Sequence, residues 1–198
     1  METKRSIFGE FKLHIQTLLY IVVLLWAIEI VDQFIFQGAL DQWFGIHPRT
    51  LSGLIGIVCA PFLHGDFTHL IANTVPLVSL GWLVMLRRTE DWVIVSVIAA
   101  LCSGLGTWLI GAPYSVHIGA SGVIFGYFGF LLLRGYFERS AVAIAFSILV
   151  TFLYGSIIWG VLPTQPGVSW EGHLCGFLGG VLAARLLANP RRRQPDDF

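Results

Sequence analysis

Hydrophobic residues fall in six long runs, separated by shorter polar or glycine-rich stretches. Each run is long enough, or nearly so, to cross a bilayer whose hydrocarbon core is about 30 Å thick. Because this core offers no water to backbone groups, the runs predict helices rather than strands. The pattern therefore predicts an all-α membrane protein with six transmembrane helices. We place them at Ile15–Ile35, Leu70–Leu86, Trp92–Ile110, Ile118–Leu133, Ala141–Val161 and His173–Ala188.

Basic residues gather on one side of this arrangement. They precede the first run, join the second to the third and the fourth to the fifth, and close the sixth, whereas Arg49 lies in a connection of the other side. These residues are Lys4, Arg5, Lys12, Arg87, Arg88, Arg134, Arg139, Arg185, Arg191, Arg192 and Arg193. By the positive-inside rule both termini face the cytoplasm. This predicts an N-terminal cytoplasmic segment (1–14), a six-helix domain (15–188) and a basic cytoplasmic tail (189–198).

Composition agrees with a membrane protein, with 56% hydrophobic and 12% charged residues and a formal net charge of zero. A balanced charge gives no general attraction to nucleic acid, and we expect the lipid bilayer as the surroundings. The cysteines (Cys59, Cys102, Cys175) are scattered along or beside apolar runs and suggest neither disulfides nor a metal site. His64, His69, His117 and His173 could together suggest a zinc site, but no His-Glu-x-x-His motif is present. We expect no metal and no cofactor.

Three polar residues lie at a similar predicted depth near the outer side. Counted from the first arginine at the inner end of each run, at about 1.5 Å per residue, Ser121 lies roughly 20 Å up, His173 roughly 18 Å and Asn73 roughly 21 Å. All three are thus expected about 10 Å below the outer surface of a core about 30 Å thick. A serine and a histidine at one level could act as nucleophile and base if they meet.

Glycines favour such a meeting. Gly122 and Gly126 on one run, and Gly176 and Gly180 on another, have the spacing that allows membrane helices to approach closely. A hydrogen bond of about 2.6–3.2 Å between nucleophile and base requires that closeness. Taken alone, Ser121 at a helix start is more typical of an N-cap. The same position also offers a free backbone N–H and the positive end of the helix dipole to a developing oxyanion.

Further residues could complete a catalytic site. His69 and Asn73 are four residues apart, so they share one face of the second helix and could donate hydrogen bonds to an oxyanion together with the Ser121 N–H. The alternative for each is an ordinary hydrogen bond between helices. Phe125, one turn after Ser121, could pack on the imidazole of His173.

Three short motifs resemble the signatures of rhomboid intramembrane serine proteases. They are Gly119-Ala120-Ser121-Gly122, His69-Leu70-Ile71-Ala72-Asn73 and Gly172-His173-Leu174-Cys175-Gly176, in the family's order along the chain. The resemblance implies a six-helix rhomboid-like bundle, Ser121 as nucleophile, and His173 as general base and acid. It further implies an oxyanion hole of His69, Asn73 and the Ser121 N–H, with Gly119, Gly122 and Phe125 in support.

The implied activity is hydrolysis of peptide bonds in or near transmembrane segments of other membrane proteins, at a site that opens to the outer side of a prokaryotic cell membrane. Residues 36–67 would be the family's membrane-embedded first outer loop, although Leu54–Ile57 lacks the Trp-Arg pair that members often carry there. The outer loop 162–171 is expected to cap the site, and the fifth run to gate it. A catalytically silent client-binding relative, or a small transporter, remains the alternative.

Overall fold

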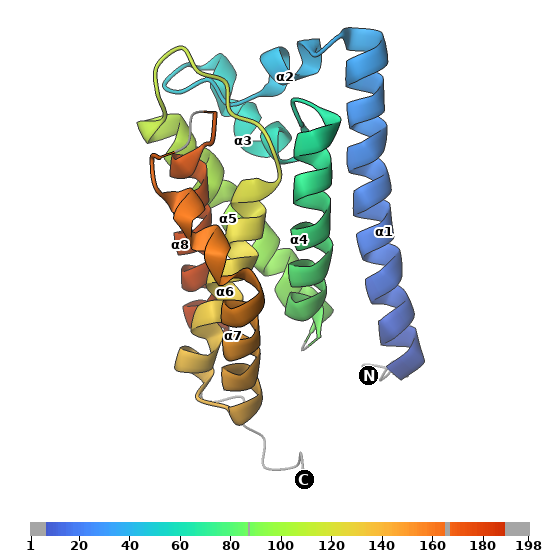
Figure 1. Ribbon diagram of the computed structural model, residues 1–198, viewed down its shortest axis with the longest axis vertical. Coiled ribbons are helices and arrows are strands. Elements are labelled where there is room, and N and C mark those ends of the chain that lie inside the picture. Colours follow the sequence, from blue (N-terminus) through green and yellow to red (C-terminus); the bar gives the residue numbers. More distant parts are fainter. Residues whose placement is uncertain (1–6, 87, 165–166, 189–198) are drawn as a thin grey trace.

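The computed structural model describes residues 7–86, 88–164 and 167–188. Its long helices are α1 (Ile7–Val31), α4 (Phe67–Met85), α5 (Thr89–Ile110), α6 (Ser121–Glu138), α7 (Ala141–Tyr154) and α8 (Trp170–Leu187). They run roughly parallel to one long axis (Figure 1). Within these residues there is no strand beyond one isolated bridge between Ile46 and His117. The predicted basic tail, Arg87, and the first six residues of the predicted N-terminal segment lie outside the described residues.

The segment between α1 and α4 folds into short helical pieces at one end of the bundle (Figure 1). A π-helical turn, η1 (Asp32–Phe36), extends α1. The chain then forms α2 (Ala39–Phe44), η2 (Ser52–Leu54), α3 (Gly56–Cys59) and η3 (Ala60–Phe62). This is the segment that the sequence assigned to the first outer loop.

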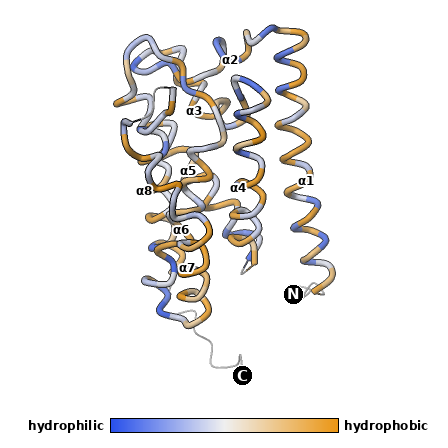
Figure 2. Tube along the Cα trace, viewed as in Figure 1, coloured by the Kyte–Doolittle hydropathy of each residue, from blue (hydrophilic) through white to orange (hydrophobic). Residues whose placement is uncertain are grey.

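Four of the described helical segments are long and apolar enough to cross a membrane: 7–36, 67–85, 89–110 and 141–161. Hydrophobic residues cover the lengths of the helices, and hydrophilic ones gather mainly at their ends (Figure 2). Many large apolar side chains point outward, including Tyr20, Val75 and Phe152, the last 86% exposed. An apolar surface of this extent indicates a lipid environment rather than water. The protein is an all-α integral membrane protein.

Helix α6 forms the centre of the bundle. Its phenylalanines Phe128 and Phe130 and the tyrosine Tyr127 are each 1% exposed, and α6 packs most extensively against α8. The glycine prediction is confirmed here. A Cβ placed on Gly176 would lie 2.1 Å from the carbonyl oxygen of Gly122, and one on Gly180 would lie 1.8 Å from that of Gly126. Only glycine allows two backbones to approach this closely.

The observed helices differ from the predicted runs at several ends. Helix α4 begins at Phe67 rather than Leu70, α5 begins at Thr89 rather than Trp92, and α6 ends at Glu138 rather than Leu133. The starts of α1, α6 and α8 also differ. Helix α1 starts at Ile7 rather than Ile15, because Phe11 and His14 pack against the Trp82 ring, with centroids 5.2 and 5.5 Å away. Helix α6 starts at Ser121 rather than Ile118, because Gly119 has a φ of +112° and its N–H bonds the Ala60 carbonyl. Helix α8 starts at Trp170, so that His173 lies almost one turn inside the helix instead of at its beginning.

Candidate active site

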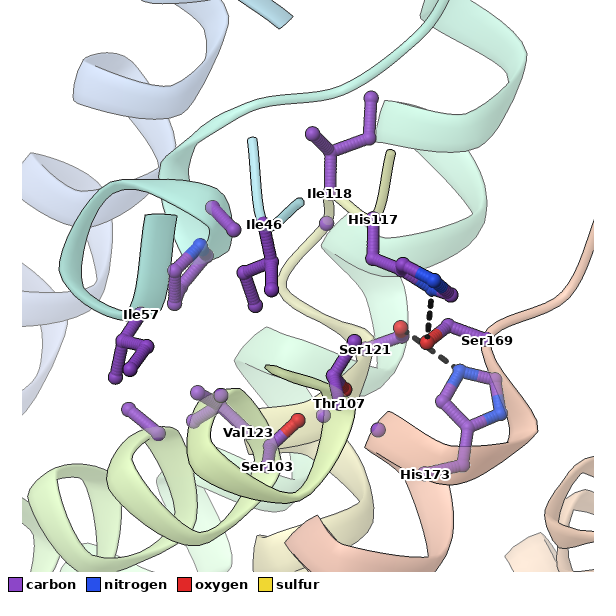
Figure 3. A pocket seen from close by; sticks show the side chains of 17 residues that line it. Ile46, Ile57, Ser103, Thr107, His117, Ile118, Ser121, Val123, Ser169 and His173 are labelled. Carbon is purple, nitrogen blue, oxygen red and sulfur yellow. Dashed lines mark hydrogen bonds between the residues drawn. The ribbon is translucent and has the colours of Figure 1, made fainter. Parts of the chain in front are cut away.

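The side chains of Ser121 and His173 meet where α6 and α8 run side by side. The distance from Ser121 Oγ to His173 Nε2 is 2.8 Å, a good hydrogen bond (Figure 3). Ser121 is the first residue of α6, and the N-cap position is taken by Ala120 without a side-chain cap. The N-cap alternative for Ser121 is therefore wrong, and its hydroxyl is free to face the imidazole.

A backbone carbonyl sets the tautomer of His173. His173 Nδ1 lies 2.9 Å from the carbonyl oxygen of Gly160, in the 3-10 segment η4 (Gly155–Val161) after α7. A carbonyl only accepts hydrogen bonds, so Nδ1 carries the proton and donates it. In a neutral imidazole Nε2 is then the acceptor, and the Ser121 hydroxyl donates to it. The carbonyl thus holds the imidazole as a carboxylate does in serine hydrolases that have a catalytic triad.

Phe125 holds the other side of the imidazole. Its ring stacks on that of His173 with centroids 4.1 Å apart and planes 9° from parallel. Gly160 lies against both rings: a Cβ there would be 2.8 Å from Phe125 Cζ and 3.2 Å from His173 Nδ1. The imidazole is therefore confined by a ring, a carbonyl and a hydroxyl, which leaves it little freedom to rotate.

Two potential oxyanion donors stand on α4 opposite the start of α6. At the left-handed Gly119, a Cβ would lie 2.8 Å from His69 Cε1 and 3.6 Å from Asn73 Nδ2, so the glycine admits both side chains. The buried Asn73 Nδ2 has no hydrogen-bond partner within the described part of the chain. An unpaired buried donor costs stability, and such groups concentrate at functional sites. As the first residue of α6, Ser121 adds an N–H that no helical carbonyl accepts.

All of these groups border one cavity of about 620 Å³. His69, Asn73, Ser121, Phe125 and His173 line it, together with parts of the loops that precede α4, α6 and α8. That volume is within the range of small-molecule and peptide sites. The cavity is large enough to admit water and a small ligand.

Two further histidines lie next to these groups, His117 in the lining of the same cavity and His64 beside His69. His117 bonds the hydroxyls of Ser115 (2.6 Å) and Ser169 (2.8 Å), tying the loop before α6 to the loop before α8. Burial lowers the pKa of His117, although the charge of Glu171 opposes this, and the lowered pKa favours the neutral ring. His64 is fully buried, with its ring centroid 5.2 Å from that of His69. Among the described residues no three His, Cys, Asp or Glu side chains are grouped to hold a metal ion.

Sequence reasoning missed Gly160, Ser115 and Ser169. Gly160 acts through its backbone carbonyl, which every residue has, so no side-chain pattern could single it out. The two serines are short hydroxyl residues in polar loops, where such residues are common. By contrast the structure brings together the polar residues of the three motifs, His69, Asn73, Ser121 and His173, around one cavity.

Comparison with known proteins identifies the family to which the chain belongs. Residues 51–190 match the rhomboid domain, so the chain belongs to the rhomboid family, as the motifs suggested. An uncharacterised protein of Mycobacterium tuberculosis is 43% identical over 185 residues, which cover 89% of this chain and 76% of the relative. A Mycobacterium leprae protein, also uncharacterised, is 41% identical over 185 residues, 89% of this chain and 72% of the relative.

A more distant relative carries a protease name. Rhomboid-like protease 5 of Toxoplasma gondii is 28% identical over 152 residues, which cover 73% of this chain and 17% of that much longer protein. The shared part is thus the helical domain rather than the whole of the Toxoplasma protein.

Proposed function

We propose that this protein is an intramembrane serine protease that cleaves peptide bonds in or near transmembrane segments of other membrane proteins. The observation that carries the proposal is the 2.8 Å hydrogen bond from Ser121 Oγ to His173 Nε2, with Nδ1 held by the Gly160 carbonyl. Membership of the rhomboid family supports the same reading. The proposal includes six membrane spans, with α6 and α8 as the fourth and sixth, cytoplasmic termini, a membrane-embedded loop between α1 and α4, and a prokaryotic cell membrane.

The reaction follows from the protonation states of the dyad. Ser121 Oγ attacks the scissile carbonyl carbon while His173 Nε2 accepts the hydroxyl proton. The charge that develops on the carbonyl oxygen is stabilised by His69, Asn73 Nδ2 and the Ser121 N–H. When the tetrahedral intermediate collapses, His173 returns the proton to the leaving amine, and an acyl ester remains on Ser121. Water from the cavity hydrolyses this ester by the same steps in reverse, again with His173 as base.

A direct test combines active-site labelling with proteolysis. The purified protein in liposomes is treated with a fluorophosphonate and, separately, incubated with a panel of single-pass membrane proteins. We expect labelling and cleavage in the wild type, and neither in Ser121→Ala or His173→Ala. Ser52→Ala, which changes an exposed serine outside the cavity, should behave like the wild type.

The rival functions predict other outcomes. A catalytically silent client-binding protein would show no labelling of folded wild type and no cleavage, yet would retain membrane proteins. A transporter would show saturable solute flux without proteolysis. Cleavage that persists in Ser121→Ala would show that Ser121 is not the nucleophile.

A further inference from the structure

A second cavity lies on the far side of α4 and α6 from the Ser121–His173 pair, between α1 and α5. Its volume is about 370 Å³, and nearly all of the side chains around it are apolar. Helix α1 stands at the edge of the bundle beside α4 (Figure 1), and its main helix contact is with α4 rather than α5. The two helices therefore leave a gap between them that no side chain in the described part of the protein fills.

On both helices, the residues that line this gap lie on one face of the helix. Helix α1 contributes four residues with the i, i+3, i+4, i+7 spacing of a helix face that is normally buried against protein. They are Leu18, Ile21, Val22 and Leu25. Helix α5 contributes the opposite wall, from Trp92 to Leu101. Leu18 and Leu25 are buried by the rest of the chain, at 4% and 2% exposed, whereas Ile21 and Val22 are part-buried and border the gap.

The outer end of the cavity is closed, and its side is continuous with the lipid-facing surface. Ile57 of α3 packs on α5, because a Cβ on Gly104 would lie 2.8 Å from Ile57 Cγ2, and Phe62 lines the same end. Val97 and Leu101 line the cavity and are also 51% and 44% exposed on the outer surface of α5. A hydrocarbon chain in the bilayer can thus enter from the side without crossing a polar surface.

The lining and the opening at the side favour a hydrocarbon chain as the occupant. The wall from Trp92 to Leu101 is about 14 Å long at 1.5 Å per residue. Apolar cavities exclude water and take up apolar ligands. A flexible chain of methylene groups from the surrounding bilayer matches this length and this chemistry.

We propose that this cavity binds one acyl chain of a membrane phospholipid, which completes the packing between α1 and α5. The lipid enters with its headgroup at the end where α5 begins, since α3 and η3 close the other end. The site is separate from the proposed catalytic cavity, so the inference does not depend on proteolytic activity.

The test uses phosphatidylcholine vesicles in which one acyl chain carries a diazirine near its middle. After irradiation, mass spectrometry of the full-length protein locates the label. We expect the segments 57–62 and 96–101 to be labelled several-fold more strongly than the exposed surface of α7 around Phe152. Ala100→Phe, which fills the cavity from α5, should lower this labelling at least fivefold, as should Val22→Phe from α1. Val93→Phe, a matched change at an exposed position of α5 outside the cavity lining, should leave it unchanged.

A second measurement keeps the result interpretable. Phosphatidylcholine added to delipidated protein in detergent should raise the unfolding temperature of the wild type and of Val93→Phe more than that of Ala100→Phe, since a ligand stabilises the state that binds it. Equal labelling of the cavity and of the outer surface, or labelling that persists in folded Ala100→Phe and Val22→Phe, would overturn the proposal. So would displacement of the label by a transmembrane substrate peptide, because the cavity would then be part of the substrate site.

Discussion

Gly176→Ala adds one methyl group where α6 and α8 approach each other beside the proposed dyad. The new Cβ would lie 2.1 Å from the carbonyl oxygen of Gly122, whereas ordinary contacts begin near 3.4 Å. Because the obstacle is backbone rather than a mobile side chain, the two helices must separate by about 1 Å. Gly122 follows Ser121 directly, and Gly176 is three residues after His173, so the separation acts on the dyad itself.

Both stability and catalysis should suffer from this separation. Overpacking of a tight interior lowers the free energy of unfolding by about 1–3 kcal/mol. The 2.8 Å bond between Ser121 Oγ and His173 Nε2 would lengthen by about 1 Å, beyond hydrogen-bonding distance. Misplacement of reacting groups by about 1 Å can lower a rate about 100-fold. We therefore expect a fall of about two orders of magnitude in the rate at which a fluorophosphonate labels Ser121.

The assay compares labelling rate, cleavage in liposomes and unfolding temperature in one preparation. Gly155→Ala is the matched control, because a Cβ there meets only Thr151 Cγ2 at 3.8 Å, an ordinary contact. It should match the wild type in all three measurements. If Gly176→Ala unfolds at the wild-type temperature and labels within twofold of the wild-type rate, then close α6–α8 contact does not set the dyad distance.

Three further predictions concern single side chains. Asn73→Ala should slow cleavage about 100- to 1,000-fold, as removal of one oxyanion donor does elsewhere, and complete loss like that of Ser121→Ala would contradict this. Phe125→Leu removes the stacking on His173, which is worth about 0.5–1.5 kcal/mol, so kcat should fall about 2- to 10-fold with KM unchanged. A change in KM with kcat unchanged would argue against an orienting role for Phe125. Burial, reinforced by two nearby carboxylates, raises the pKa of Asp41 to about 7. Since the unfolded chain has a pKa near 4 at this residue, the folded protein binds the extra proton between those values, and its stability falls as pH rises through that window. Asp41→Asn should remove this decline in thermal unfolding measured from pH 4 to 8, and an unchanged profile would refute the assignment.

The helices themselves were predictable, because a bilayer imposes a length and an apolar composition on every segment that crosses it. The ends of the helices were less predictable. The beginning of α1 depends on Phe11 and His14 packing against Trp82, a contact far apart in sequence. The beginning of α6 depends on the hydrogen bond from the Gly119 N–H to the Ala60 carbonyl, which belongs to another part of the chain.

The candidate site was also predictable only in part. Side chains with distinctive chemistry, such as Ser121, His173 and Asn73, stand out in an apolar sequence because polar groups in a membrane are costly. The Gly160 carbonyl does not stand out, and neither does the hydrogen bond from His117 to Ser169. Each depends on two segments of the chain that come into contact only in the folded protein.

By itself, the sequence determined the class of protein and the approximate helices, since these follow from hydrophobic run length and residue chemistry. Tertiary structure alone decided the 2.8 Å contact of Ser121 with His173, the tautomer set by Gly160, and the lipid-facing cavity between α1 and α5. The physical reason is that catalysis and cavity shape depend on distances of a few ångström between helices. Those distances result from backbone contact at glycines such as Gly122 and Gly176, and they emerge only when all the helices are packed together.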